Sequence, residues 1–350
     1  MFKSSGDTNM SDRRKIRWLI AHFPVHLFQR TAEAFTQELE ALLPGQFEVE
    51  IHTIDSYVDQ YQKLEALRLK KPSIPGLEDS TSEHTVGHIS DMQQKWTTFF
   101  DALRAGDFEM SQTQVFTVAE QLKNKDFAAL DLPFLFDSHD HVSRVLDGQI
   151  GDEMCAKLAE TSDVKGLAFT YSGGYRIIGN TTGIKSLDEL AENELIVSSE
   201  PSKVLFNELG TTTLNKASID VASLADNGAK GTAVETTYIR FTGKHVLKTN
   251  HSMFLTTILT GTKFWNTLTA EQQEAFATAA KRVAKIERQW SVDDAAQYER
   301  NAVANGVTIV DLSDADRERL SKRAKLSYRH VEQMGIDMNL VKRIVERRKD

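Results

Sequence analysis

The residue best suited to bind a small charged molecule is Arg176, in the run Gly174-Tyr175-Arg176. A guanidinium offers its N–H donors in a planar fork that matches the oxygens of a carboxylate or a phosphate. Glycine beside it allows the backbone to approach a ligand closely. The opposite interpretation, a structural ion pair of Arg176, stays open from the sequence. The pattern predicts a small-molecule binding site rather than an active site.

Motifs of common catalytic chemistry are missing from the sequence. There is no Gly-x-Gly-x-x-Gly, no phosphate-loop lysine motif and no Gly-x-Ser-x-Gly. Ser172-Gly-Gly lacks the flanking glycine of a nucleophile elbow, so we interpret it as a turn between strands. Acidic residues are abundant, but no pair stands out at a spacing typical of general acid–base catalysis. We therefore predict no catalytic residues.

The sequence also predicts neither a metal site nor a cofactor. The single cysteine, Cys155, excludes an intramolecular disulfide and a multi-cysteine metal site, and its apolar helical surroundings predict a buried structural thiol. His84 and His88 could share a metal on a helix, but their segment resembles a loop. In Asp137-Ser-His-Asp-His141, one of the first two residues is better explained as the N-cap of a helix.

Length and composition describe an ordinary globular chain. Its 350 residues suffice for two lobes of usual domain size, with 40% hydrophobic and 26% charged residues. The net charge of −8 argues against nucleic acid as the main partner, although an acidic protein can still carry a locally positive pocket. No stretch approaches the roughly 20 apolar residues of a membrane-spanning helix. The polar N-terminus shows no secretory signal, and we expect residues 1–13 to be a disordered tail.

The elements that must position Arg176 follow an α/β pattern. An apolar run at 16–21 predicts a buried strand, an apolar stripe over 28–42 predicts an amphipathic helix, and alternation over 47–51 predicts a second strand. This is a β-α-β unit. We expect helices at 61–69 and 96–103. Further strands are expected at 108–110, 166–171, 175–178, 195–197, 232–234, 253–259 and 307–312.

Helix boundaries are marked by capping patterns. Ser186 with Glu189 and Thr269 with Gln272 each form the spacing of a capping box. Residues 270–304 contain no proline or glycine, which predicts one helix of about 50 Å at roughly 1.5 Å per residue. Such a helix is longer than one small lobe, so we expect it to bridge two lobes.

The segment Asp126–Leu158, with Leu132-Pro-Phe-Leu-Phe136 inside it, resembles the solute-binding subunits of tripartite ATP-independent periplasmic (TRAP) transporters. The type is the dicarboxylate-binding P-subunit (DctP-type) family. Similar matches are Ile16-Arg-Trp with His22-Phe-Pro, the run 100–110, Gly174-Tyr-Arg176 with 184–190, Thr249-Asn-His251, and 264–273. Together these pieces cover most of residues 15–325.

Two departures from the family pattern affect its site. The family usually places a second arginine in the strand after the capped helix, where it pairs with the carboxylate of the ligand. The matching residue here is Ile196, which cannot form an ion pair, so the sequence leaves open whether the solute carries a carboxylate. Residues 58–95 form an inserted excursion in place of a shorter glycine-rich connection.

The resemblance implies a two-lobed periplasmic-binding-protein-like (Venus-flytrap) α/β fold with mixed sheets and a long helix that bridges the lobes. It implies capture of a small organic molecule between the lobes and delivery to the membrane subunits of a TRAP permease, in the periplasm, without catalysis, as a monomer or weak dimer. By resemblance the ligand-binding residues are Arg176, Phe23, Pro24, Ser111, Gln112, Thr113, Ser198, Glu235 and Thr236.

The predicted division places 14–173 and 249–286 in lobe I, and 174–248 and 287–350 in lobe II. Phe23 could instead be a core residue, and Glu235 a helix cap or a solvated side chain. Two alternatives to a transport function also remain: a ligand-sensing module, and an α/β hydrolase or lyase. A serine or carboxylate within hydrogen-bond reach of a histidine in the cleft would favour the enzyme.

Overall fold

The computed structural model of the chain describes residues 13–22, 25–68, 89–197, 199–214, 229–241 and 243–349. Within these ranges the fold is α/β, as the sequence predicts. None of their helices combines the length and the apolar character that crossing a membrane requires. The strands are β1 (Arg14–Ile20), β2 (Phe47–Thr53), β3 (Met110–Gln114), β4 (Val164–Asn180), β5 (Glu194–Ile196), β6 (Thr212–Leu214), β7 (Gly231–Glu235), β8 (His245–Lys248), β9 (Met253–Gly261) and β10 (Thr308–Asp311).

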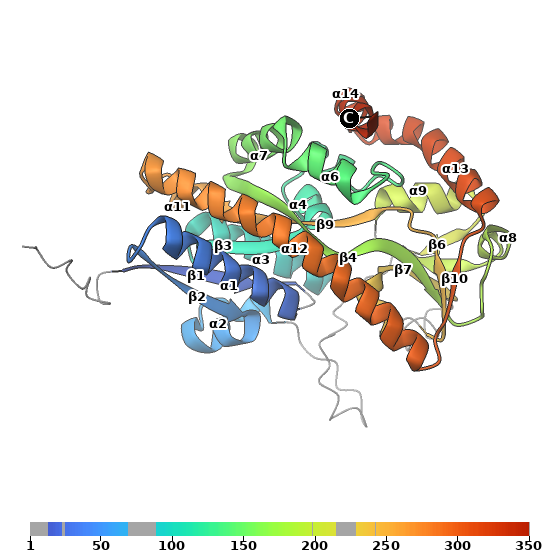
Figure 1. Cartoon of the computed structure of the whole chain (residues 1–350), viewed down its shortest axis with the longest axis horizontal. Helices are drawn as coiled ribbons and strands as arrows, with labels where there is room; N and C mark the ends of the chain where they lie inside the picture. The colour runs from blue at the N-terminus through green and yellow to red at the C-terminus, as the bar shows by residue number, and fades with distance from the viewer. Residues whose placement is uncertain are drawn as a thin grey trace, which may run out of the picture.

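The helices lie on both faces of the sheet, and several are short (Figure 1). The α-helices are α1 (Val25–Leu42), α2 (Ile54–Tyr61), α3 (Ile89–Ala105), α4 (Val115–Gln121), α5 (Lys125–Ala129), α6 (His139–Leu146), α7 (Gln149–Ser162), α8 (Leu187–Ala191), α9 (Glu200–Glu208), α11 (Thr262–Trp265), α12 (Ala270–Ala304), α13 (Asp314–Gln333) and α14 (Met338–Glu346). Short 3₁₀ turns are η2 (Glu65–Leu67), η3 (Thr236–Phe241) and η4 (Arg347–Lys349).

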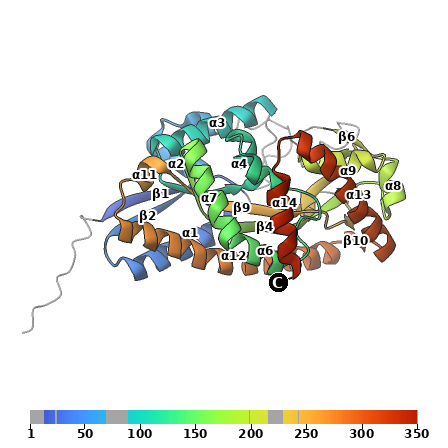
Figure 2. The ribbon, with the colours of Figure 1, turned by 90° about the horizontal axis from the view of Figure 1, so that it is seen from above.

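The first half of the sheet has the strand order β2-β1-β3-β9-β4. β1 is parallel to β2 and β3, whereas β9 runs antiparallel to both β3 and β4, so the sheet is mixed. Trp18 on β1 packs with α1 and α12, and the next residue, Leu19, packs with α3 on the opposite face. Figure 2 shows these two helical layers. Burial on both faces explains why β1 is apolar at successive positions.

Strand β4 joins the two halves of the sheet. Its first part pairs with β9, and from Arg176 onward it pairs with β7 and then β8. The pairing with β9 shifts register between Tyr171 and Tyr175, where Gly173 and Gly174 adopt positive φ. The sequence predicts a turn and two strands here. The structure instead has one strand with an irregularity, because the glycines bend the chain without ending its pairing.

The second half of the sheet has the order β4-β7-β5-β6, with β8 pairing β4 and β10 pairing β8. β5 is parallel to β6 and β7, and β10 is parallel to β8. Its core includes Ile178 of β4, Leu205 of α9 and Leu320 of α13. This cluster is separate from the two cores of the first half.

The long helix α12 runs along both halves (Figure 1). The side chain of Thr269 accepts a hydrogen bond from the Gln272 backbone N–H, and the side chain of Gln272 accepts one from the Thr269 N–H, which confirms this capping box. Near its N-terminus, Phe276 packs with β1 and α1, whereas Ala302 near its end packs with β7 and β8. The prediction of one bridging helix over 270–304 is confirmed.

The C-terminal helix α14 returns to the first half, where Leu340 and Ile344 join the core that contains α6 and α7. His141 lies 2.7 Å from the backbone oxygen of Ile344, and Arg343 pairs with Glu153 at 2.6 Å. The predicted assignment of residues to two lobes stays a proposal. Any such assignment has to accommodate this return of the chain.

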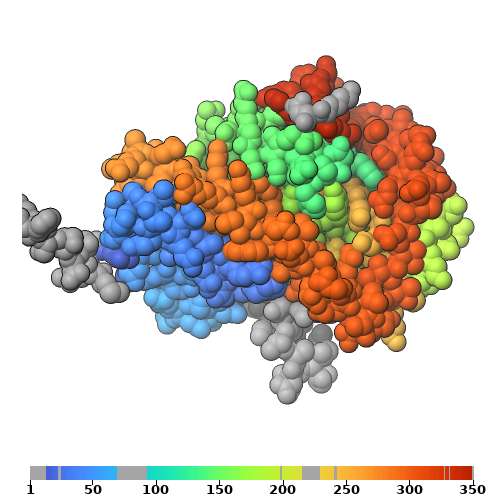
Figure 3. Space-filling view, in the orientation of Figure 1, coloured from blue at the N-terminus to red at the C-terminus, as the bar shows by residue number. Residues whose placement is uncertain are grey.

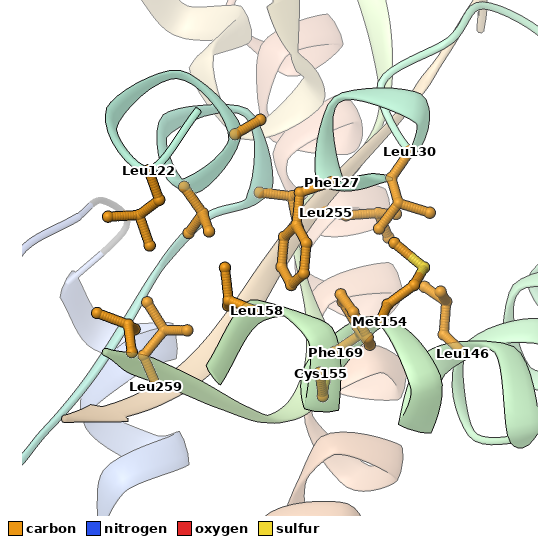
Figure 4. Close-up of a cluster of buried hydrophobic side chains, with 14 of the residues drawn as sticks. Leu122, Phe127, Leu130, Leu146, Met154, Cys155, Leu158, Phe169, Leu255 and Leu259 are labelled. Carbon is orange, nitrogen blue, oxygen red and sulfur yellow. The ribbon is translucent and has the colours of Figure 1, made fainter. Parts of the chain in front are cut away.

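The largest core cluster contains Cys155 (Figure 4). Its thiol is buried, and burial raises its pKa to about 12, so it carries no thiolate at neutral pH. A Cβ built on Gly166 would lie 2.7 Å from the Cys155 sulfur, so the thiol packs directly against β4. The prediction of a structural cysteine is confirmed.

Two further sequence expectations require correction. In place of the helix expected at 61–69, α2 spans Ile54–Tyr61, because Thr53 and Ser56 form a capping box that starts the helix earlier. Part of the predicted excursion is core, since Val58, Leu64 and Leu67 are buried in the largest cluster. Residues 69–88, with His84 and His88, lie outside the described part of the chain.

Candidate functional site

Arg176 lies on β4 just after the irregularity, directly opposite Glu235 on β7. Both side chains are buried, with 3% of each residue exposed. The backbone N–H of Arg176 donates to the Ser252 carbonyl at 2.8 Å, which ties β4 to the segment before β9. Thr236 follows Glu235, and its hydroxyl donates to the Tyr175 carbonyl at 3.4 Å. Three predicted site residues, Arg176, Glu235 and Thr236, are thus brought together.

A second carboxyl, Asp131, approaches Arg176 from the segment after α5. Its Oδ1 lies 3.7 Å from the Arg176 Nη2, an ion pair longer than a hydrogen bond. Burial raises the pKa of Asp131, and the charge of Arg176 and a hydrogen bond from Ser199 oppose this increase. Asp131 is 7% exposed. The structural ion pair that the sequence left open is therefore present, but it is loose.

The Arg176 guanidinium lies over the ring of Phe254, 4.5 Å from its centroid. Stacking covers a face of the guanidinium and leaves its edge for hydrogen bonding. Its Nε has no hydrogen-bond partner among the described residues, and the same holds for the buried atoms Ser252 Oγ, Thr237 Oγ1 and His251 Nε2. Buried polar atoms without partners are rare in folded proteins, because each costs desolvation free energy.

We call Arg176, Asp131, Glu235 and His251 the Arg176 cluster. Burial raises the pKa of Glu235 to about 7, against the opposing charge of Arg176. Burial and the nearby Arg176 lower the pKa of His251 to about 3, so its ring is neutral. The His251 Nδ1 lies 2.8 Å from the hydroxyl of Thr249. The cluster therefore holds one permanent cation.

The predicted residues on β3 lie in a different environment. The Ser111 hydroxyl donates a hydrogen bond to the Leu19 carbonyl at 2.5 Å. Thr113 is buried, and its hydroxyl has no hydrogen-bond partner among the described residues. The Gln112 amide nitrogen lies 2.8 Å from Thr170 Oγ1, 3.2 Å from Thr256 Oγ1 and 3.3 Å from Glu287 Oε1. β9 separates β3 from β4, so these residues are not next to Arg176 in the sheet.

We call Gln112, Thr170, Thr256 and Glu287 the Glu287 network. The second carboxyl oxygen of Glu287 accepts from the Tyr171 backbone N–H at 2.8 Å. Burial raises the pKa of Glu287 to about 8, although this hydrogen bond and the charge of Arg288 oppose the increase. One turn later on α12, Ser291 Oγ accepts from the Gly173 N–H at 2.9 Å. Helix α12 thus holds β4 by side-chain hydrogen bonds where the strand is irregular.

The run Leu132–Phe136 connects Asp131 to α6, and the C-terminal region holds it in place. The Phe134 N–H donates to the His251 carbonyl at 2.7 Å, and the Tyr328 hydroxyl donates to the Pro133 carbonyl at 2.7 Å. Arg348 donates to the carbonyls of Phe134 and Leu135 at 2.5 and 2.9 Å. Phe134 adopts a φ of 57°, which a bulky residue rarely does. These contacts fix the backbone that carries Asp131.

The remaining predicted residues, Phe23, Pro24 and Ser198, lie outside the described residues. Ile196 is buried beside Ala229 and Leu214. Sequence reasoning missed Asp131, His251 and Phe254. The signal for Asp131 was a carboxylate directly before an apolar run, where a solvated role is unusual.

Helix α6 begins at His139, with Ser138 as its N-cap, as predicted. In the described part of the chain, His, Cys, Asp and Glu side chains nowhere gather in a group that could hold a metal ion. The surface is hollowed between α12, α6 and α13, and Figure 3 shows green to gold atoms from the middle of the chain at the floor of this hollow.

Comparison with known proteins gives consistent matches. Residues 95–334 match the family model of bacterial extracellular solute-binding protein, family 7. The chain is 23% identical over 258 residues to the C4-dicarboxylate-binding protein DctB of Bacillus subtilis. This match covers 71% of this chain and 73% of that protein.

Two solved structures share the fold. A TRAP periplasmic solute-binding protein from Ochrobactrum anthropi matches with a TM-score of 0.75 and 20% identity, over 97% of this chain and 96% of that one. One from Desulfovibrio desulfuricans, with bound sn-glycerol-3-phosphate, matches with a TM-score of 0.75 and 18% identity, over 96% of this chain and 98% of that one. This likeness confirms the predicted two-lobed fold.

Proposed function

Because the chain belongs to the bacterial extracellular solute-binding proteins of family 7, we propose that it captures one small polar organic molecule between its two lobes and delivers it to a TRAP-type membrane permease. It does so by binding alone, without catalysis, and outside the cytoplasmic membrane. The protein acts as a monomer or weak dimer. The family match supports the transport role, and the fold supports capture between lobes.

The main evidence for the binding site is the guanidinium of Arg176, which is buried and lacks part of its hydrogen bonds. Folding has removed it from water, its ion pair with Asp131 is 3.7 Å long, and its Nε has no partner in the described residues. A solute oxygen would supply the missing acceptor. The Bacillus subtilis relative is named for C4-dicarboxylates, and the Desulfovibrio desulfuricans protein holds a phosphate ester, so both ligands present such oxygens.

Glu235 and Thr236 belong to the same proposed site because they adjoin Arg176. Phe23, Pro24 and Ser198 remain proposed site residues by family resemblance, as do Ser111, Gln112 and Thr113. Gln112 has its amide nitrogen in the Glu287 network, so its unpartnered Oε1 is the atom that could face a solute.

The first test is a thermal-shift screen of organic acids, sugars and amino acids, because a bound solute raises the apparent stability by mass action. Calorimetry on each hit then compares the native chain with Arg176→Ala. We expect the variant to bind at least tenfold more weakly. Arg282→Ala is the matched control, since Arg282 is exposed on α12 and pairs with Glu38 at the surface. Unchanged affinity of Arg176→Ala would remove this residue from the site.

The second test addresses closure of the lobes. Small-angle scattering with and without the identified solute should show a smaller radius of gyration for the bound protein. The expectation rests on the connections between the halves, which include β4 and α12 and can act as a hinge. Identical scattering curves in the two states would count against closure.

A further inference from the structure

The Arg176 cluster contains more acid than base. Its carboxyls, Asp131 and Glu235, and its one guanidinium are each more than nine-tenths buried. His251 contributes no charge, because burial keeps its ring neutral. One ionised carboxyl therefore already balances the positive charge of Arg176 before any solute arrives, and ionisation of both would exceed it.

The surroundings do not reverse this balance. Glu120 lies within electrostatic range of Asp131, Glu200 and Lys203, so this neighbouring group adds two acids and one base. Lys203 is itself paired with Glu200 at 2.9 Å. Ile196 is 2% exposed and packs against Ala229 and Leu214, so its side chain supplies no cation. Among the described residues, Arg176 is the cation that acts on both Asp131 and Glu235.

The hydrogen bonds that described residues make to the two carboxyls do not fill their acceptor capacity. A carboxylate can accept about four hydrogen bonds. Asp131 receives one from Ser199, and Glu235 receives one from its own backbone N–H. The Arg176 Nε, a donor, lacks an acceptor among the described residues. The cluster therefore has places for donors at two carboxyls and for an acceptor at one guanidinium.

Resting on the proposed function, we propose that the captured solute carries no net charge. It presents ammonium or hydroxyl donors to Asp131 and Glu235 and an acceptor oxygen to Arg176. A doubly negative solute would bring two further negative charges into a buried site that holds a single guanidinium, and uncompensated buried charge is strongly unfavourable. A zwitterion or a neutral polyol instead leaves the charge balance of the site unchanged.

The test measures dissociation constants by calorimetry for probes of matched carbon number and graded charge. The four-carbon series is succinate, L-aspartate, L-asparagine and erythritol, and the six-carbon series is D-glucarate, D-gluconate and D-glucose. We expect the strongest binder to be an uncharged or zwitterionic probe, at least tenfold tighter than the doubly negative probe of its series. Tighter binding of the doubly negative probe that Arg176→Ala abolishes would overturn this inference and leave the proposed function standing.

Two other results would contradict the proposed site or the proposed function. Binding that Arg176→Ala leaves unchanged would remove Arg176 from the site, and a complete absence of binding across both series and the wider screen would contradict the proposed function. Either result would also contradict the inference that the solute carries no net charge. The two failures are therefore distinguished by the response of each binder to the Arg176 variant.

A charge-removing variant gives an independent measurement. Glu235→Gln keeps the shape of the side chain but removes its negative charge, so the affinity for a singly negative probe should rise at least fivefold relative to the uncharged probe of the same series. Glu194→Gln is the matched control, because Glu194 is exposed on β5 and its removal changes the net charge equally. An unchanged affinity ratio in Glu235→Gln would show that this carboxyl does not face the solute, and would overturn the inference.

Discussion

The Glu287 network and the Arg176 cluster lie along the same strand, β4, and both are buried, but their hydrogen bonding differs. In the network, Glu287 accepts from Tyr171 and Gln112, and Thr256 donates to the Tyr171 carbonyl at 3.1 Å. In the cluster, Arg176 and His251 each have a buried polar atom without a partner among the described residues, and so does the neighbouring Ser252. A few residues of one strand therefore separate a mostly satisfied network, in which Gln112 Oε1 alone lacks a partner among the described residues, from a less satisfied cluster.

The difference indicates different roles. Satisfied buried networks fix a unique arrangement of the elements that contribute to them, here β3, β4, β9 and α12. Unsatisfied buried groups lower stability unless a partner arrives from outside the chain. We therefore expect substitutions in the Glu287 network to change mainly the free energy of unfolding, and substitutions in the Arg176 cluster to change mainly solute affinity.

The largest expected effect is that of Glu287→Ala. The change removes the acceptor of the Tyr171 N–H and of the Gln112 amide and leaves a cavity, so the free energy of unfolding should fall by about 3 kcal/mol. Urea denaturation at pH 6 measures it. Lys285→Ala, at an exposed position on the same helix, should change stability by less than about 0.5 kcal/mol. Equal losses in both variants would contradict a structural role for the network.

The pH dependence of stability should show the raised pKa of Glu287. In the folded chain this pKa is about 8, above its ordinary value of 4.5, so the folded state binds more protons between these values. Stability contributed by the protonated carboxyl is therefore fully present below pH 4.5 and is lost as the pH rises through 8, by at most about 1.4 kcal/mol per pH unit.

Glu287→Gln should flatten this slope, because glutamine keeps an acceptor for Tyr171 but does not titrate. Urea denaturation at several pH values between 5 and 9 compares the two proteins. Glu235, whose pKa is about 7, contributes a slope of the same sign to both proteins, so the informative quantity is the difference between them. An identical slope in the variant would place the titration elsewhere.

The irregular part of β4 between the two regions allows a matched glycine pair to be compared. Gly173 and Gly174 have φ values of 81° and 74°, which alanine adopts only at a cost of about 1 kcal/mol. A Cβ on Gly173 would also lie 2.6 Å from Thr237 Oγ1, whereas a Cβ on Gly174 meets no atom of the described residues within 4 Å. Gly173→Ala should therefore lose roughly 2 kcal/mol and Gly174→Ala roughly 1 kcal/mol by urea denaturation. Equal losses would indicate that Thr237 moves aside freely.

Much of the fold followed from local sequence patterns. The cap of α12 and the absence of proline and glycine from 270–304 predicted its bounds almost residue by residue, since both signals are local. Ser186 also caps α8 as predicted, although the Glu189 side chain accepts from the Lys185 N–H rather than from the Ser186 N–H. The continuity of β4 could not be predicted, because Ser172-Gly-Gly has the composition of a turn and only the pairing with β9 and β7 keeps the strand extended.

The site was harder to predict than the fold. Arg176 and Glu235 were identified, but Asp131 comes from a segment 45 residues earlier, and no local pattern relates it to Arg176. Glu287 has the sequence environment of an ordinary solvated helix residue, with Lys285 and Arg288 close by in the sequence. Its burial follows only from where α12 lies against β4, which is a tertiary property.

The smallest expected effects come from one substitution, threonine to valine, made in each region. Thr256 Oγ1 donates to the Tyr171 carbonyl and lies 2.6 Å from Thr170 Oγ1, so Thr256→Val should lower the free energy of unfolding by about 1 to 2 kcal/mol. Thr237 Oγ1 has no partner among the described residues, so Thr237→Val should change the free energy of unfolding by less than about 0.5 kcal/mol.

Solute affinity should respond in the reverse order. Thr237 adjoins Gly173 and follows Glu235 by two residues, so its free hydroxyl can serve the solute, and Thr237→Val should weaken binding about threefold or more. Thr256→Val should leave affinity within about twofold, because its hydroxyl is already used within the chain. Calorimetry with the identified solute measures both. If the two variants lost stability and affinity in the same proportion, the unpartnered hydroxyl of Thr237 beside the Arg176 cluster would have no special relation to binding, and the distinction between the two regions would fail.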